Sequence, residues 1–294
     1  MHINSRTRAL AVFLGPALAA IGLFFFVPVL AAFVMSFTDF DIYSLGDLRY
    51  ARFVGMRNYL QLFEDPLFWK ALWNTLYFLV AGGPLSIAVS LGAAVLLQSK
   101  LVRYQSFFRF VYFAPVVTTL VAVAIVWRFI YHPRFGVLNF FLSFLGVDMI
   151  DWLGDPQWAM PAIIILAVWK NFGYNMIIFI AGLQNIPASL YEAASIDGAG
   201  TWQRFTKITL PMLAPTTVFI TVITMIGYFQ LFAEPYVMTQ GGPLNSTLSI
   251  VLLMYQQGFR WWNMGYSAAI AFVLFACILV ASIVQTQLQG RGGE

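Results

Sequence analysis

Long apolar runs recur along the chain and are separated by shorter polar segments. Crossing a bilayer as a helix takes about 20 predominantly apolar residues. Six runs reach that length, at residues 10–37, 71–97, 107–131, 158–183, 212–238 and 266–288. Their apolar positions are continuous, whereas the strands of a membrane β-barrel alternate. The pattern therefore predicts an all-α membrane protein of about six transmembrane helices, with residues 1–294 forming a single transmembrane domain.

Composition supports lipid as the solvent. Of the 294 residues, 61% are hydrophobic and 10% are charged, and the mean hydropathy is +0.80. A soluble domain of this size needs a far more charged surface. Basic residues precede the first apolar run, as in a signal peptide, but the run is longer than a cleaved signal requires. We expect a retained helix, and the net charge of +4 is too small to indicate nucleic-acid binding.

Metal-binding and catalytic clusters are not expected. Cys277 is the single cysteine and lies in the last apolar run, so an intramolecular disulfide is excluded. The two histidines, His2 and His132, lie in a tail and at a predicted helix end. Within the apolar runs, Lys170 and Glu234 are accompanied only by scattered amides. This set lacks the nucleophile, base or metal ligands that a membrane enzyme would need.

Proline and glycine positions mark helix ends and kinks. Asp65-Pro66 and Asp155-Pro156 each read as an N-cap residue followed by proline at the first helical position. Gly82-Gly83-Pro84 and Pro115 lie inside predicted helices. There they either bend a helix and widen a pore or let neighbouring helices pack closely.

The polar segment 187–211 has the pattern of a helix–turn–helix. Ser189 and Glu192 have capping-box spacing, and Gly198 suits the left-handed end of a first helix. Trp202, Phe205 and Ile208 then recur on one side of a second helix. These features alone fit either a hairpin that folds back under the membrane or a docking surface for another protein.

The spacing within this segment resembles the EAA motif of ABC importer permeases. The matching positions are Glu192, Ala193, Ala194, Asp197, Gly198, Ile208, Leu210 and Pro211. Segments 53–75 and 236–247 are similar to the first and last outer loops of the carbohydrate-uptake branch of that family. The resemblance covers most of the chain, in the family's order.

The resemblance implies that 187–211 is a cytoplasmic coupling segment that docks on an ATPase. Glu192 would pair with a basic residue there, Gly198 would set the bend, and the two alanines would permit the close fit. No phosphate-binding GxxxxGK[ST] run occurs in the chain. ATP and Mg are therefore expected on the partner, with no cofactor in this chain and no enzymatic activity of its own.

The resemblance also implies partners and a location. The expected partners are a second, related permease, a cytoplasmic ATPase dimer and an extracytoplasmic substrate-binding protein. The expected location is the inner or plasma membrane of a prokaryote, with both termini cytoplasmic. Lys and Arg divide almost evenly between the two sides in that orientation, so the positive-inside rule adds little.

Polar residues inside the predicted helices are candidates for a substrate site, because such residues usually face protein or a water-filled path. The candidates are Lys170, Asn171 and Tyr174 in the fourth helix, and Gln230, Glu234 and Tyr236 in the fifth. Lys170 and Glu234 fit either a pore lining or an interhelical ion pair. Thr217, Thr221 and Thr224 are expected to bond backbone or a neighbouring helix.

The predicted function is the transmembrane pore subunit of an ATP-driven importer for a sugar, oligosaccharide or polyol. Glycerol phosphate is the alternative cargo, disfavoured because Lys170 is the one obvious basic group within the pore-forming helices. An ion-gradient-driven secondary transporter is the alternative class. It would usually show an internal repeat between its halves, and the sequence has none.

Overall fold

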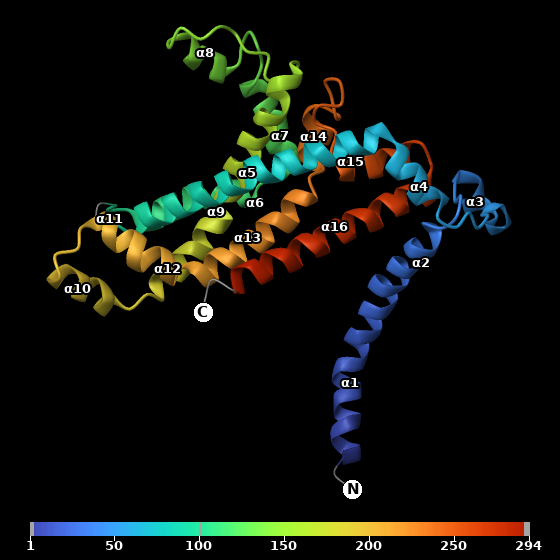
Figure 1. Cartoon of the computed structure of the whole chain (residues 1–294), viewed down its shortest axis with the longest axis horizontal. Coiled ribbons are helices and arrows are strands. Elements are labelled where there is room, and N and C mark those ends of the chain that lie inside the picture. The colour runs from blue at the N-terminus through green and yellow to red at the C-terminus, as the bar shows by residue number, and fades with distance from the viewer. Residues whose placement is uncertain (1–2, 100–101, 291–294) are drawn as a thin grey trace. The chain divides into compact units, whose positions relative to one another are not determined.

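The computed structural model of the chain describes residues 3–99 and 102–290 (Figure 1). These residues are helical or irregular, apart from an isolated antiparallel bridge between Thr38 and Phe53. Five spans in the described part are long and apolar enough to cross a membrane: Val12–Met35, Pro66–Gln98, Pro156–Gln184, Ala214–Met238 and Met264–Gln287. A sixth is a bent pair of helices. The predicted all-α membrane fold is confirmed. His2 lies outside the described residues.

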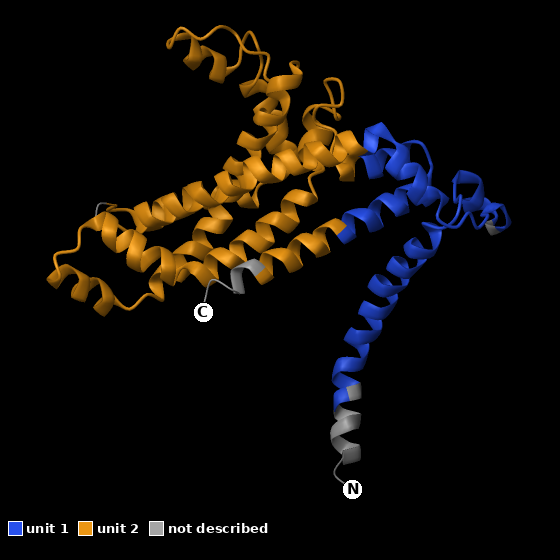
Figure 2. Cartoon of the chain, viewed as in Figure 1, with its two compact units in different colours: residues 1–68, 253–276 blue, residues 69–252, 277–294 orange. Residues whose placement is uncertain are grey.

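The chain divides into two compact units, residues 1–68 with 253–276 and residues 69–252 with 277–294 (Figure 2). The prediction of a single transmembrane domain stays a prediction. The helices of the first segment are α1 (Ile3–Ile21), the π-turn Gly22–Phe26, α2 (Val27–Met35), α3 (Ile42–Gly46), the 3₁₀ turn Leu48–Tyr50 and α4 (Arg57–Glu64). Three helices cross the boundaries between the units: α5 (Pro66–Gln98), α15 (Ile250–Tyr255) and α16 (Met264–Gly290). The π-turn Gln256–Arg260 separates α15 from α16.

Polar contacts inside the first unit hold the end of α2. The buried Asn58 amide donates to the carbonyl oxygens of Ser36 and Thr38, at 2.9 and 2.8 Å. The hydroxyls of Ser36 and Tyr59 lie 2.7 Å apart. At the start of α16 the Gly265 N–H donates to the carbonyl of Phe40. The bonds of Asn58 and Gly265 pair backbone groups close to the ends of α2 and α16, where the helix itself leaves such groups open.

The second unit contains the remaining helices and all of α5 except residues 66–68. They are α5 (Pro66–Gln98), α6 (Gln105–Val117), α7 (Leu120–Ile130), α8 (Val137–Ser143), α9 (Pro156–Gln184), α10 (Ala188–Ile196), α11 (Thr201–Arg204), the π-turn Phe205–Thr209, α12 (Leu210–Met212), α13 (Ala214–Phe229) and α14 (Ala233–Met238). Within this unit α6 packs on α9, and α7 packs on α14.

The predicted third span, 107–131, is a broken helix. Its halves α6 and α7 meet at a bend of 101°. The break follows Pro115 closely, because Thr118 and Thr119 have extended backbone. A second interruption separates α13 from α14 at residues 230–232. Neither span therefore crosses as one straight helix.

Two apolar cores lie along the central helix α9. One gathers around Phe78, Ile163 and Tyr228, and the other around Ala94, Phe179 and Leu213. The predicted caps are confirmed, since the Asp65 carboxylate accepts from the Leu67 N–H at 2.8 Å and Asp155 accepts from the Gln157 N–H at 2.8 Å. The second unit thus consists of long spans packed around α9.

Glycines let two pairs of helices pack closely in the second unit. A Cβ atom at Gly173 on α9 would clash with the backbone carbonyl of Tyr112 on α6. A Cβ at Gly82 on α5 would lie 3.0 Å from the Tyr228 ring. Small residues at membrane helix interfaces allow this kind of backbone approach. Gly82 therefore serves close packing, one of the two roles open for it in the sequence.

We expect Gly173→Ala to lower stability by about 1–3 kcal/mol, because α6 must move away from α9 to admit the methyl group. Gly92→Ala is the matched control, since a Cβ at Gly92 on α5 meets no atom within 4 Å. That variant should be neutral or up to about 1 kcal/mol more stable, because alanine favours helix over glycine. Thermal unfolding in mild detergent measures both, and equal effects would contradict the tight α6–α9 contact.

Candidate functional site

The segment 187–211 folds as a helical hairpin, as predicted. Helix α10 ends in a Schellman turn, in which the Ala199 N–H donates to the Ala194 carbonyl at 2.8 Å. Gly198 has a φ of +77°, the left-handed conformation expected of it. The predicted Ser189 cap is wrong, because α10 begins at Ala188 after Pro187 and has no side-chain cap.

Side chains tie the two arms of the hairpin together. The Tyr191 and Thr209 hydroxyls lie 2.9 Å apart, and the Arg204 guanidinium donates to the Ser195 hydroxyl at 3.0 Å. Ile208 and Tyr191 pack on the core around Leu213. The hairpin therefore packs on the ends of α5 and α9, and the chain also connects it directly to α9.

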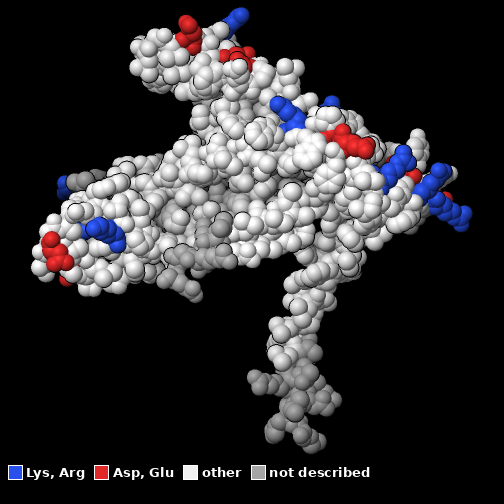
Figure 3. Space-filling view, in the orientation of Figure 1, with Lys and Arg blue, Asp and Glu red and all other residues white. Residues whose placement is uncertain are grey.

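The opposite side of the hairpin is open. Glu192 and Ala193 are exposed, and Ile196 and Trp202 expose 87% and 73% of their surface. On the face of the second unit seen in Figure 3, charged side chains gather over α10–α11 and around α8, while the surface visible between these two regions is white. An exposed apolar patch with charges around it is typical of a protein docking surface.

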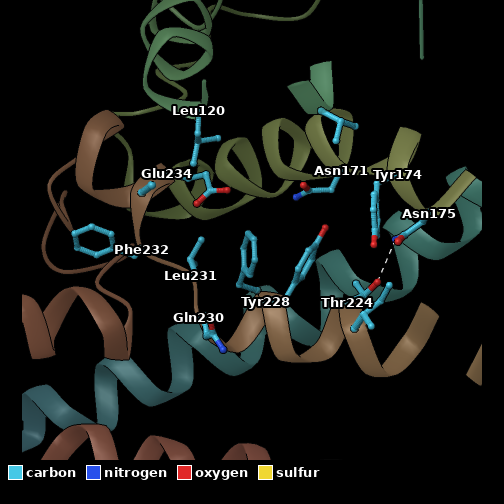
Figure 4. Close-up of a pocket in the computed structure, with 15 residues that line it drawn as sticks. Leu120, Asn171, Tyr174, Asn175, Thr224, Tyr228, Gln230, Leu231, Phe232 and Glu234 are labelled. Carbon is cyan, nitrogen blue, oxygen red and sulfur yellow. Dashed lines mark hydrogen bonds between the residues drawn. The ribbon is translucent and has the colours of Figure 1, made fainter. Parts of the chain in front are cut away.

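A cavity of about 450 Å³ lies in the second unit, midway along α9 (Figure 4). Helices α6 and α7 contribute Val116 and Leu120 to its wall, and α5 contributes Phe78. The remaining lining residues come from α9, from α13, from the joining residues 230–232 and from the start of α14: Asn171, Tyr174, Asn175, Ile223, Thr224, Gly227, Tyr228, Gln230, Leu231, Phe232, Ala233 and Glu234. Both interrupted spans therefore meet at this cavity.

Lys170 caps the C-terminal end of α6 by hydrogen bonds. Its Nζ donates to the carbonyl oxygens of Pro115, Val116 and Thr118, at 2.9, 3.3 and 3.1 Å. An ammonium has three N–H donors, so these bonds use all of them and leave none for Glu234. The positive charge also lies at the negative end of the α6 dipole. Lys170 thus holds the backbone at the bend.

Buried polar groups of the cavity wall are only partly paired. Asn175 donates to the Thr224 hydroxyl at 3.1 Å and so joins α9 to α13. The Tyr228 side chain is 5% exposed, and its hydroxyl lies near Ser86 and Asn171. It meets no partner at hydrogen-bonding geometry among the described residues. A buried hydroxyl without a partner points to a water molecule or ligand in the cavity.

The structure brings four of the six predicted substrate residues together. Asn171, Tyr174, Gln230 and Glu234 line the cavity. Tyr236 lies beside it on α14 and stacks on Phe232, with ring centroids 5.2 Å apart. Lys170 is directed to the α6 carbonyls instead. The threonine expectation is confirmed for Thr221 and Thr224, since the Thr221 hydroxyl donates to the Thr217 carbonyl and the Thr224 hydroxyl accepts from Asn175.

Sequence reasoning missed Asn175 and Phe78 as lining residues. Asn175 follows Asn171 by four residues, a spacing that places both on one helix face. That signal was present in the sequence. Phe78 carried no such signal, because an isolated aromatic residue in an apolar helix looks like packing.

The chain matches the family model of the binding-protein-dependent transport system inner membrane component over residues 2–291. The chain belongs to this family. It is 40% identical to the lactose transport system permease protein of Rhizobium radiobacter, over 93% of this chain and 91% of that protein. It is 38% identical to the arabinooligosaccharides transport system permease protein of Bacillus subtilis, over 97% and 90%.

A solved structure has the same fold. The chain aligns with a chain of a bacterial alginate ABC transporter crystallised with an alginate-bound periplasmic protein, with a TM-score of 0.83. The two chains are 24% identical, and the alignment covers 99% of this chain and 96% of the other. Membership of the permease family confirms the predicted class of multi-pass ABC importer permease. It disfavours the secondary transporter.

We expect Lys170→Met to destabilise this permease by about 1–3 kcal/mol, because the Val116 and Thr118 carbonyls lose their donor in a buried place. Lys70→Met makes the same change at an exposed position on α5 and should have little effect. Thermal unfolding gives the overall loss, and hydrogen exchange at residues 117–123 should rise only in the Lys170 variant. Unchanged exchange there would mean that Lys170 does not hold the bend.

Proposed function

We propose that this permease forms one half of the translocation pore of an ABC importer that brings a sugar or related hydroxyl-rich solute into the cell. The observation that carries the proposal is the cavity at two interrupted spans, midway along the helix whose end leads into the exposed hairpin. Transporter sites commonly lie at discontinuous helices near the middle of the membrane. One helix, α9, therefore serves both the substrate site and the coupling site.

The cavity chemistry suits a sugar. Asn171, Gln230 and the Tyr174 and Tyr228 hydroxyls offer hydrogen-bonding groups, and Phe78 and Phe232 offer flat apolar faces. The named cargoes of the two relatives, lactose and arabinooligosaccharides, are sugars. An oligosaccharide or a polyol fits the same groups.

Coupling requires partners. We infer that α10 docks on a cytoplasmic ATPase, which binds ATP and Mg, with Glu192 paired to a basic residue there. Ala193 and Ala194 permit close approach, Gly198 sets the turn, and Ile208, Leu210 and Pro211 join the hairpin to α13. A second, related permease completes the pore, and an extracytoplasmic binding protein delivers the cargo. This arrangement places both termini in the cytoplasm.

The first test is to tag the chain, extract it from native membranes in mild detergent and identify the proteins that co-purify. Recovery of a second permease with an ATPase supports the proposal. Recovery of this chain alone, under conditions that preserve a known importer complex, counts against it. Uptake should also stop on ATP depletion and survive dissipation of the ion gradient.

We expect Glu192→Lys to abolish coupling and leave the fold intact. Losing a charge-assisted pair with the ATPase costs about 1.5–3 kcal/mol, or about 10- to 100-fold in affinity, and the reversed charge adds repulsion. Uptake should fall to background, with an unchanged unfolding temperature because the Glu192 side chain is exposed. Asp148→Lys is the matched control, since it reverses an exposed charge in the loop after α8. Normal uptake in the Glu192 variant would remove the coupling role.

Asn171→Ala and Gln230→Ala should each raise the substrate concentration for half-maximal uptake about 2- to 10-fold, because each removes a hydrogen bond of about 0.5–1.5 kcal/mol. The maximal rate should change less, provided that the amides bind the ground state. Gln157→Ala alters an exposed amide on α9, the helix of Asn171, but outside the cavity, and should match the wild type. If neither cavity variant shifts half-saturation, the substrate binds elsewhere.

A further inference from the structure

The cavity has an uneven charge. Among the described residues that line it, Glu234 alone has a side chain of the charged type. The other polar members are amides and hydroxyls. Figure 4 shows the Glu234 carboxylate directed into the space that Asn171 faces from α9. An anionic solute that entered this cavity would therefore face the Glu234 carboxylate.

Lys170 interacts electrostatically with Glu234 but lies outside the cavity wall. Although it precedes Asn171 in the sequence, it is absent from the lining, and its three donors are bonded to the α6 carbonyls. The ammonium therefore offers no free N–H to a solute. Its charge also lies at the negative end of the α6 dipole.

A carboxylate in a half-buried place has two effects on a solute. Its oxygens accept hydrogen bonds from hydroxyl groups, and charge-assisted bonds of this kind are the stronger ones. It also repels a phosphate, sulfonate or carboxylate on the solute, by about 10- to 100-fold in affinity for one like charge at close range. Neutral and anionic solutes are thereby separated.

We propose that Glu234 is a specificity-determining residue that accepts the hydroxyls of an uncharged sugar and excludes anionic solutes from the cavity. The proposal rests on the cavity being the substrate site of the importer. It goes beyond the family, because family membership leaves the charge of the cargo open. Here the inference about the charge of the cargo comes from the position of Glu234 in the cavity wall and from the hydrogen bonds of Lys170 to the α6 carbonyls.

A thiol probe measures the charge of the cavity without knowledge of the cargo. Gln230→Cys in a Cys277→Ala background places a single thiol of this chain on the cavity wall. In the membrane-embedded full complex, the chain is treated with methanethiosulfonates that carry a trimethylammonium or a sulfonate group. The ratio of the two rates is divided by the ratio for a free thiol in solution.

We expect the cationic reagent to be favoured about tenfold or more over the anionic one, since a fixed carboxylate attracts one and repels the other. Adding Glu234→Gln should bring the ratio close to one, and adding Glu234→Lys should invert it. Glu64→Gln removes an exposed carboxylate outside the cavity lining and should leave the ratio unchanged. A ratio near one with Glu234 present, or no change on Glu234→Gln, would overturn the proposal.

Uptake by the full importer gives the second arm, with lactose, arabinan oligosaccharides and glycerol 3-phosphate as probes. Uptake of a neutral probe with exclusion of glycerol 3-phosphate supports the proposal, and wild-type uptake of glycerol 3-phosphate overturns it. Absence of ATP-dependent uptake for every solute in a wider screen would count against the proposed function instead. The thiol rates would still decide the charge of the cavity.

Discussion

Backbone carbonyls at a broken helix cannot stay unpaired away from water, and the structure of the second unit depends on how this constraint is met. Helix α6 stops at Val117, and the chain turns by 101° before α7 begins. The ammonium of Lys170 supplies donors to the carbonyls left open. The Lys170 ammonium, which would be costly in lipid, thereby gains hydrogen-bond acceptors. The carbonyls at the bend, which would be costly to leave unpaired, gain donors. Each feature makes the other tolerable.

The bend has consequences for the cavity. Because the span breaks, α6 packs along α9, whereas α7 takes another direction and packs on α14 as well as on the core around Ile163. Gly173 brings the backbones of α6 and α9 together just beyond Lys170. The second break, at residues 230–232, is stabilised by a residue from another segment, because the Ser249 hydroxyl donates to the Leu231 carbonyl. Irregular backbone at membrane depth is tolerated where it lies in protein or lines a cavity, and both breaks do.

The sequence predicts the spans, the hairpin and most of the cavity, because these follow from apolar length, turn chemistry and helical spacing. The turn at Gly198 requires a left-handed backbone, wherever the hairpin lies in the molecule. The spacing of Asn171 and Tyr174 places both on one face of α9, whichever way that helix is rotated. The sequence could not predict the partner of Lys170. Its acceptors are main-chain oxygens 52 to 55 residues away, and every residue carries such an oxygen. The sequence offered only the side chain of Glu234 as a partner. The size of the bend could not be predicted either, because Pro115 indicates a kink but does not fix its angle.

Helix α9 is the element through which the two functional regions of this permease communicate. It passes the cavity at Asn171–Asn175 and ends at Gln184, four residues before α10 begins at Ala188. Phe179 and Ile180 near its end belong to the same core as Tyr191 and Ile208 of the hairpin. A displacement of the docked hairpin therefore reaches the cavity along a continuous helix and a packed core. Over the same distance α13 is preceded by a π-turn and followed by a break. Coupling needs an element whose position both sites bias, and α9 is the candidate. Helix α6, held to α9 by Lys170, would follow its movement.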